Sequence, residues 1–341
     1  MALKKVRIHE AVGMVLGHDM TKIVPGEYKG PAFKKGHIIQ PEDIPHLLNI
    51  GKEHIYLLEL GDQQIHENEA AERIARLVSG ENTYMAGPSE GKVTIIAKQD
   101  GLLKVNRAAV TSINAVDYAV FSTLHGNRLV KAGEILAGVK VVPLIVDDQV
   151  VRTVERIAGE YQDIVAVKPL RALKTGIITT GNEVFYGRIQ DKFGPVLRDK
   201  IEDYKAEFSG ITFQPDKAEA ITQAIMDYAQ AGVEVIVVTG GMSVDPDDVT
   251  PDAIRATGAE VITYGTPVLP GAMFMLAYLG NIAILGLPAC GMFSKITVLD
   301  LVFPRILAGE RLSKQDFAEM GYGGLCMGCK ECSYPCCPFG K

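Results

Sequence analysis

From residue 172 onward the chain alternates between short apolar segments and longer amphipathic segments. Segments such as "KTGIITTG" and "VEVIVVTGG" are rich in β-branched residues, and the stretches between them, such as "AEAITQAIMDYAQAG", have helical spacing. Strands and helices in alternation predict a mainly parallel sheet with helices on both faces. We therefore expect an α/β domain over residues 148–312, in which a helix over 194–210 precedes a strand that starts at Ile211.

The stretch "VIVVTGGMSVDPDDVTPDAI", residues 235–254, joins a buried strand to a helix through a polar loop. Gly240 and Gly241 accept a positive φ and allow the backbone to approach a ligand closely, and Thr250 is a good N-cap for the helix. An anionic ligand here would need a divalent cation such as Mg²⁺ between itself and the loop's carboxylates. The pattern fits either a metal-assisted phosphate or pterin-type site or an Asp-rich turn that caps a helix. The carboxylates belong to Asp245, Asp247 and Asp248.

A second polar turn follows the first strand of this region, over residues 179–183. Ligands of open α/β sheets bind beyond the carboxyl ends of the strands. The turns at 180 and 240 should therefore share one edge of the sheet and form one site. The alternative for this turn is that its hydroxyls only cap the backbone. Its residues are Thr179, Thr180, Gly181, Asn182 and Glu183.

Composition and charge narrow the class of protein. The chain has 341 residues, of which 47% are hydrophobic and 22% charged, so it can form two or three domains with substantial cores. A net charge of −6 offers no basic field, which disfavours nucleic acid as a partner. The start "MALKKVRIHEAVG" has no apolar segment of the kind found in secretory signals. We therefore expect a cytoplasmic protein.

One uncharged run, residues 272–293, is long enough to cross a membrane. Gly280 and Asn281 divide it into "MFMLAY" and "IAILGL", and Pro288 interrupts the run after the second of these segments. This pattern predicts a β-hairpin rather than a membrane span.

Changes in the residue pattern along the sequence predict four parts. Residues 1–65 mix short elements, with a helix from Pro41 to Gly51 and a strand at "HIYLLEL", and predict a small α+β domain. Residues 66–147 predict an amphipathic helix over 67–80 followed by a β-rich module. The α/β domain over 148–312 and a Cys-rich tail over 313–341 complete the chain.

Four segments of the C-terminal half then carry a resemblance: "ITTGNEV", "VVTGGMSVDPDDV", "GAEVITYGTPVLPG" and "ILGLPACG". In this order and spacing they resemble the molybdopterin-binding domain shared by the molybdenum insertion enzymes of molybdenum cofactor synthesis. The resemblance implies a three-layer αβα domain that binds molybdopterin or adenylyl-molybdopterin with the help of Mg²⁺. It also implies a transferase that inserts molybdate, a homodimer, and partners among other cofactor-synthesis proteins or a recipient molybdoenzyme.

The resemblance assigns roles to individual residues. The residues that would hold Mg²⁺ or position molybdate are Asp248, Glu183 and Asp191. The residues that would contact the pterin are Thr179, Thr180, Gly181, Asn182, Gly240, Gly241, Met242, Ser243, Asp245, Pro270, Gly271 and Pro288.

The sequence also departs from the family pattern. Asn182 stands where the family has Asp, and Leu269 and Ala272 replace the two lysines of its Lys-Pro-Gly-Lys-Pro segment. Those lysines would neutralise a pterin phosphate through charge-assisted contacts. Two alternatives to a molybdopterin molybdenumtransferase therefore stay open: a non-catalytic carrier or sensor of the cofactor, and a docking platform for a redox partner.

The tail "CMGCKECSYPCCPFGK" contains five of the six cysteines. Without an export signal, such density indicates metal binding rather than disulfides. The spacing C-x₂-C-x₂-C-x₃-C is close to the bacterial ferredoxin run that ligates a [4Fe–4S] cluster, and four thiolates also suit Zn²⁺. A reactive, unliganded tail is the remaining alternative. The five are Cys326, Cys329, Cys332, Cys336 and Cys337, whereas the sixth, Cys290, is expected to be buried as a small apolar residue.

Overall fold

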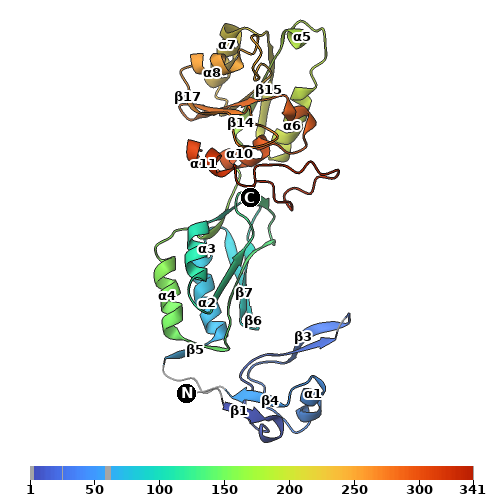
Figure 1. Ribbon diagram of the computed structural model, residues 1–341, viewed down its shortest axis with the longest axis vertical. Helices are drawn as coiled ribbons and strands as arrows, with labels where there is room; N and C mark the ends of the chain where they lie inside the picture. The colour runs from blue at the N-terminus through green and yellow to red at the C-terminus, as the bar shows by residue number, and fades with distance from the viewer. Residues whose placement is uncertain (1–3, 25, 58–62, 341) are drawn as a thin grey trace. The chain divides into compact units, whose positions relative to one another are not determined.

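The computed structural model describes residues 4–24, 26–57 and 63–340 (Figure 1). Its contacts divide the chain into two compact units. One contains residues 1–99, 104–124 and 131–167, and the other contains residues 100–103, 125–130 and 168–341. The predicted four-part division stays a prediction. It differs from the two units at residues 148–167, which belong to the first unit.

The N-terminal part of the first unit is small and mixed. Its apolar core includes Ile8, Leu47 and Ile55. The predicted helix from Pro41 to Gly51 is present in a shorter form, and the last three residues of the predicted strand "HIYLLEL" lie outside the described residues. The elements are β1 (Lys4–Arg7), η1 (Ile8–Glu10), β2 (Met20–Val24), β3 (Tyr28–Phe33), α1 (Asp43–Asn49) and β4 (His54–Leu57), with β1 antiparallel to β4 and β2 antiparallel to β3.

The rest of the first unit contains an antiparallel sheet of order β6-β7-β11-β9, against which α2 packs. The predicted amphipathic helix and β-rich module are both present. Helix α3 was not predicted, and α4 packs against α2 and α3. The elements are β5 (Gln64–His66), α2 (Glu67–Val78), β6 (Thr83–Ser89), β7 (Lys92–Ala97), α3 (Arg107–Asn114), β9 (Ala119–Thr123), β11 (Ile135–Val141), β12 (Ile145–Asp147) and α4 (Asp148–Ala158). Strand β13 (Val165–Lys168) ends the first unit, whereas β10 (Arg128–Val130) and the first residues of β8 (Gly101–Val105), which pair antiparallel, belong to the second unit.

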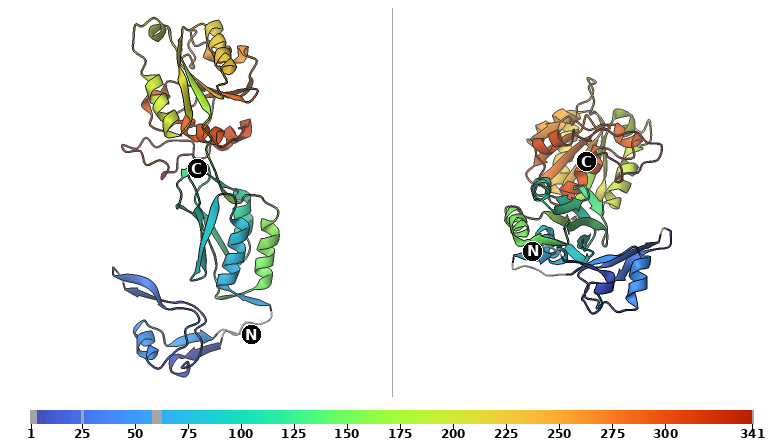
Figure 2. Two further views of the ribbon diagram at one scale, coloured as in Figure 1. Left: turned by 180° about the vertical axis from the view of Figure 1, so that it is seen from behind. Right: turned by 60° about the horizontal axis from the view of Figure 1, so that its bottom comes forward.

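The second unit contains a six-stranded sheet of order β15-β14-β16-β19-β18-β17 (Figure 2). Strands β15, β14, β16 and β19 are mutually parallel, whereas β18 is antiparallel to both β19 and β17. This confirms the predicted mainly parallel sheet. The strands are β14 (Lys174–Thr180), β15 (Glu207–Gln214), β16 (Val235–Thr239), β17 (Glu260–Tyr264), β18 (Met275–Leu279) and β19 (Ile282–Leu287).

Helices cover both faces of this sheet, which confirms the predicted three-layer architecture. Helices α6, α10 and α11 pack into one apolar cluster and α7 and α8 into the other. Alternate side chains of β14 reach the two clusters, with Ile177 in the first and Ile178 in the second. The helices are α5 (Asn182–Phe185), α6 (Phe193–Asp203), α7 (Ala218–Gln230), α8 (Thr250–Ala256), α9 (Cys290–Phe293), α10 (Val298–Leu307) and α11 (Lys314–Glu319).

The predicted end of one helix and the predicted start of the strand after it need correction, whereas the predicted hairpin is confirmed. The helix predicted to continue to Gly210 ends at Asp203, because Lys205 adopts a left-handed φ of 60° that stops it, and β15 already begins at Glu207. The predicted hairpin around Gly280 is confirmed as β18 and β19. No helix among the described residues is both long enough and apolar enough to cross a membrane.

A buried ion pair joins α6 to α10. The ammonium of Lys200 donates to both carboxylate oxygens of Asp300, at 2.6 and 2.7 Å, and the hydroxyl of Tyr204 donates to the same carboxylate at 3.0 Å. Asp300 also accepts from the backbone N–H of Thr297 at 2.7 Å and so closes a capping box at the start of α10. Its side chain is 3% exposed and that of Lys200 is 16% exposed. One carboxylate therefore fixes both helices.

We expect Asp300→Ala to lower the free energy of unfolding by about 3–5 kcal/mol, because the variant leaves the Lys200 charge buried without its partner. Urea denaturation followed by circular dichroism measures the effect. Glu260→Ala is the matched control, since it breaks an exposed ion pair with Arg311 and should cost no more than about 1 kcal/mol. Equal losses in the two variants would contradict a structural role for the buried pair.

Candidate functional site

The register of the sheet brings four loops to one edge. Thr179 of β14 lies opposite Thr239 of β16, and Thr239 lies opposite Leu287 of β19. Thr180 lies opposite Gln214, the last residue of β15. The chain therefore leaves all four parallel strands at the same level. The expectation that the turns at 180 and 240 share one edge is confirmed.

The Gly240–Gly241 turn lies directly against the end of β14. Gly240 has a φ of 90°, and a Cβ added to it would lie 2.4 Å from the carbonyl oxygen of Thr180. Gly241 has a φ of 56°, and a Cβ there would lie 2.8 Å from the Oγ1 atom of Thr250. The hydroxyl of Thr250 is buried and donates to the carbonyl of Gly240 at 2.8 Å. Glycine is required at both positions by conformation and by space.

Two threonines end β14, and their side chains point to opposite faces of the sheet, with that of Thr180 on the face of the Gly240–Gly241 turn. Thr180 is buried, and its Oγ1 atom lies 3.5 Å from the Oγ1 atom of Thr250. Thr179 is also buried, but its hydroxyl has no hydrogen-bond partner among the described residues. An unpaired buried hydroxyl costs free energy. The Thr179 hydroxyl is therefore a buried polar group that the described residues leave unsatisfied.

A group of carboxylates lies at the same edge, and its centre is a residue that the sequence prediction missed. Asp216 accepts from the backbone N–H of Asn182 at 2.9 Å, and its own N–H donates to the Asn182 side chain at 3.4 Å. Burial raises the pKa of the Asp216 carboxyl, and the negative charges of Glu183, Asp247 and Asp248 raise it further, against the Asn182 hydrogen bond. Asp216 follows β15 by two residues, so its position beyond a strand end was the signal available in the sequence.

Asp245 and Asp248 organise the loop that follows the glycines. Asp248 accepts from the backbone N–H of Asp245 at 3.1 Å, and its own N–H donates to the Asp245 carbonyl at 2.9 Å. The side chain of Asp245 is exposed, and that of Asp248 is partly exposed. Part of the Asp-rich loop therefore stabilises the conformation of the loop through its own hydrogen bonds. The remaining carboxylate oxygens are open to solvent and ligand.

The side chains of two residues predicted for the site make contacts within the protein itself. Asp191 accepts from the backbone N–H groups of Phe193 at 2.8 Å and Gly194 at 3.2 Å, so its carboxylate caps the first turn of α6. The side chain of Met242 is buried in the core, where a Cβ added to Gly286 would lie 2.7 Å from its terminal carbon. Only the backbone of Met242 faces the loop, and its carbonyl accepts from the hydroxyl of Tyr264 at 3.4 Å.

The loops before β18 and after β19 complete the edge. Gly271 has a φ of 129°, and a Cβ there would lie 2.5 Å from a methyl group of Val298. The N–H of Val298 donates to the carbonyl of Pro270 at 3.3 Å. Gly271 and Pro288 line a small cavity of about 10 Å³ together with Lys200, whose ammonium is already bonded to Asp300.

The Cys-rich segment lies beside the Pro270 loop. A cavity of about 830 Å³ is lined by Pro270, Phe293 and Lys295 and by four cysteines, Cys326, Cys329, Cys332 and Cys337. No group of three or more His, Cys, Asp or Glu side chains within the described ranges is arranged to hold a metal ion. The side chain of Cys290, predicted to be buried, lies outside the described residues.

The edge combines a glycine turn with several carboxylates. The charges of Glu183, Asp247 and Asp248 act on the carboxyl of Asp216, so these acidic side chains lie near one another. The described residues gather no group of three or more such side chains that could hold a metal ion.

The part of the chain that carries this edge is similar to a known family of domains. Residues 176–308 match the family described as a probable molybdopterin binding domain, and residues 5–59 match a domain of unknown function.

The particular proteins that this chain resembles are CinA-like proteins. It is 34% identical over 90 residues to the CinA-like protein of Mycobacterium tuberculosis, a match covering 26% of this chain and 21% of that protein. The chain is also 37% identical over 90 residues to the CinA-like protein of Mycobacterium sp. strain JLS, and this match likewise covers 26% of this chain and 21% of that protein. The chain thus spans about a fifth of the curated relatives that it matches.

Solved structures show weaker overall similarity. The molybdopterin biosynthesis enzyme MoaB of Thermus thermophilus is 21% identical, with a TM-score of 0.34, and the match covers 40% of this chain and 98% of that one. The tungsten cofactor synthesizing protein MoaB of Pyrococcus furiosus is 18% identical, with a TM-score of 0.34, covering 41% and 98%.

We expect Gly240→Ala to destabilise the second unit more than Gly232→Ala does. Both glycines have a positive φ, which costs a substituted residue about 1–2 kcal/mol, but a Cβ at Gly232 would meet no atom within 4 Å. At Gly240 the Cβ meets backbone, so the loop must also move. Urea denaturation of the two variants measures the difference. Equal free energies of unfolding would show that the turn is not held against Thr180.

Proposed function

We propose that the α/β domain binds molybdopterin, or adenylyl-molybdopterin, at the carboxyl edge of its sheet. The domain would thereby act in molybdenum cofactor biosynthesis in the cytoplasm. The observation that carries this proposal is the Gly240–Gly241 turn, which is held against Thr180 and Thr250 at the carboxyl edge of the sheet. The family match over residues 176–308 supports it.

Each part of the edge has a role in this proposal. Backbone N–H groups after Gly240 receive the phosphate, because the loop that follows this turn lies beyond the carboxyl ends of the parallel strands. Asp248 and Asp216 share a Mg²⁺ ion with that phosphate, which offsets the repulsion between the anion and the carboxylates. Gly271 and Pro288, which line one small cavity, form the wall of the site at β18 and β19, together with the neighbouring Pro270.

Molybdate insertion would require further groups. In a molybdopterin molybdenumtransferase, Glu183 and Asp248 would position the molybdate. Two observations favour the second candidate, a non-catalytic carrier or sensor. Leu269 and Ala272 carry no charge where the resembled family has lysines, and the carboxylate of Asp191 is already engaged at the start of α6.

Mg²⁺ should tighten molybdopterin binding to the native protein at least tenfold, and Asp248→Asn should abolish this gain. The amide keeps the oxygen that accepts from the Asp245 N–H but loses the charge that attracts the cation. Fluorescence titration of the pterin, with Mg²⁺ and with EDTA, measures both dissociation constants.

Asp252→Asn is the control for this titration. It removes the same charge from the first turn of the neighbouring helix α8, where the side chain is 78% exposed and paired with Arg255. The gain from Mg²⁺ should survive in this variant. If Asp248→Asn responds to Mg²⁺ as the native protein does, the cation does not bind at Asp248.

Leu269→Lys should strengthen binding of the pterin phosphate roughly tenfold at low salt, since a charge-assisted hydrogen bond contributes about 1.5 kcal/mol. Leu269 is 52% exposed, so the longer side chain can be accommodated. The gain should decline as salt screens the charges. Lys330→Leu is the control. It removes a positive charge from the Cys-rich segment and should not weaken binding of the pterin. An unchanged affinity of Leu269→Lys at low salt would place the phosphate elsewhere.

The two candidate functions differ in a cellular test. Expression in a bacterial strain that lacks its own molybdenum insertion enzyme should restore molybdoenzyme activity only if this chain transfers molybdate. Pterin that co-purifies with the protein from a strain in which activity is not restored would support the carrier. Absence of bound pterin together with no pterin affinity in titration would contradict both candidates.

A further inference from the structure

The Cys-rich segment is fixed to the domain at both ends. At its start, Leu325 forms a parallel bridge with Leu269, and the N–H of Cys326 donates to the Leu269 carbonyl at 2.8 Å. At its end, Phe339 is buried in the apolar cluster that contains α10, and the N–H of Gly340 donates to the Gly323 carbonyl at 2.9 Å. The segment is therefore a closed loop with defined ends.

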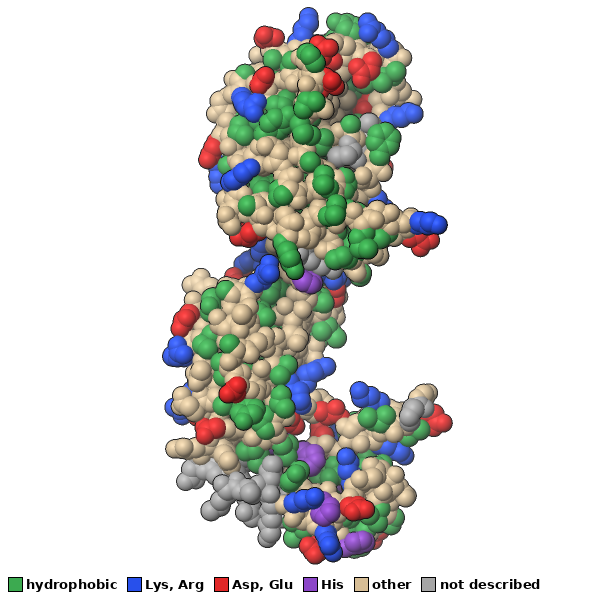
Figure 3. Space-filling view, viewed as in Figure 1, with side chains coloured by type: hydrophobic (Ala, Val, Ile, Leu, Met, Phe, Trp, Pro, Cys, Tyr) green, Lys and Arg blue, Asp and Glu red, His purple; other side chains and the backbone are tan. Residues whose placement is uncertain are grey.

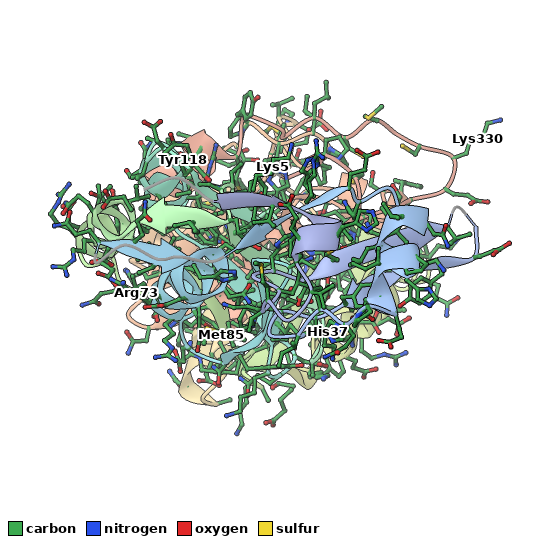
Figure 4. The ribbon with its side chains drawn as sticks, turned by 90° about the horizontal axis from the view of Figure 1, so that it is seen from below. Lys5, His37, Arg73, Met85, Tyr118 and Lys330 are labelled. Atoms are coloured by element: carbon green, nitrogen blue, oxygen red, sulfur yellow. The ribbon has the colours of Figure 1, made fainter. Side chains whose placement is uncertain are left out.

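Tyr334 provides a further anchor within the loop. It packs against the same apolar cluster and forms an edge contact with the Phe339 ring, at 6.4 Å between ring centroids. Burial, together with the nearby charges of Asp300 and Cys337, raises the pKa of Tyr334 to about 12. The aromatic residues thus fix the loop, while Cys329 and Cys332 between the anchors stay exposed (Figure 4 shows this loop at Lys330).

Four cysteines of this loop face one cavity. Cys326 and Cys337 are partly buried and pack against the apolar cluster, so their positions are set by the domain. Cys329 and Cys332 are exposed on the span between them. All four line the cavity of about 830 Å³, whereas Cys336 does not. The structure therefore separates the fifth cysteine from the other four.

We propose that Cys326, Cys329, Cys332 and Cys337 hold a thiolate-ligated metal centre, either Zn²⁺ or an iron–sulfur cluster. Four thiolates are the ligand set that both centres prefer. The described sulfur atoms are spread around the cavity rather than gathered. Binding therefore draws the exposed pair inward toward the two anchored cysteines.

This assignment differs from the one that the spacing suggests. The C-x₂-C-x₂-C-x₃-C spacing makes Cys336 the fourth ligand, as in the ferredoxin run. Cys336 is exposed, does not line the cavity, and donates its backbone N–H to the Ser333 carbonyl at 2.7 Å. Cys337 precedes Pro338 and lines the cavity beside it. The neighbouring cysteines therefore form a matched pair for the test.

The experiment measures zinc, iron and acid-labile sulfide in the full chain purified without oxygen. The metal-free chain is then loaded either with Zn²⁺ alone or with iron and sulfide. One zinc without sulfide identifies the zinc centre, and iron with an equal amount of sulfide and visible charge-transfer absorption identifies the cluster. Cys336→Ser should retain the metal content of the native chain. Cys329→Ser, Cys332→Ser and Cys337→Ser should each lower metal affinity at least tenfold.

Urea unfolding and thiol alkylation distinguish loss of a metal ligand from loss of folding. Cys329 and Cys332 are exposed, so their serine variants should unfold at the same urea concentration as the native metal-free chain. In the native chain, bound metal should also slow alkylation of both thiols by iodoacetamide at least tenfold. A native chain that takes up neither zinc nor iron and sulfide would overturn the proposal, as would metal loss in Cys336→Ser with retention in Cys337→Ser.

Discussion

Parallel hydrogen bonding between β14, β16 and β19 is the constraint on which the candidate site depends. Strand β16 is buried on both faces, so its register with β14 is fixed by two apolar clusters at once. A shift by one residue would exchange the side chains of the two faces. The level at which Thr179, Thr239 and Leu287 end their strands follows from this packing. The loops beyond them meet because the core admits no other register.

The electrostatics of the edge follow from the same arrangement. Acidic side chains gather at the end of the second unit that carries α5 (Figure 3), and the burial of Asp216 makes its ionisation costly. The lysines that would neutralise a pterin phosphate in the resembled family are absent from this chain, which has Leu269 and Ala272 in their places. Lys200 does not replace them, because its ammonium is bonded to Asp300. In the proposed function, a phosphate at this edge would therefore depend on backbone N–H groups and on a bound cation.

Much of the second unit could be predicted from the sequence, because its strands are short apolar segments, such as the β-branched run of β16, and several of its turns contain glycine. The hairpin at Gly280 and the shared edge of the turns at 180 and 240 needed only local patterns and the handedness of crossovers. Asp216 was missed because its importance comes from its neighbours across the edge, and one sequence does not show them. The burial of the Met242 side chain could not be predicted, because a single apolar residue in a loop has no periodicity to reveal that it faces the core.

The contact between Met242 and Gly286 connects the interior of the sheet to its edge. The absence of a side chain at Gly286 leaves the space that the Met242 side chain fills, and Met242 directly follows the Gly240–Gly241 turn. The height of the turn above the sheet is therefore set from below, by a buried position in β19. Substitutions that change the volume of buried side chains in β19 would move this turn while every residue exposed at the edge stays the same.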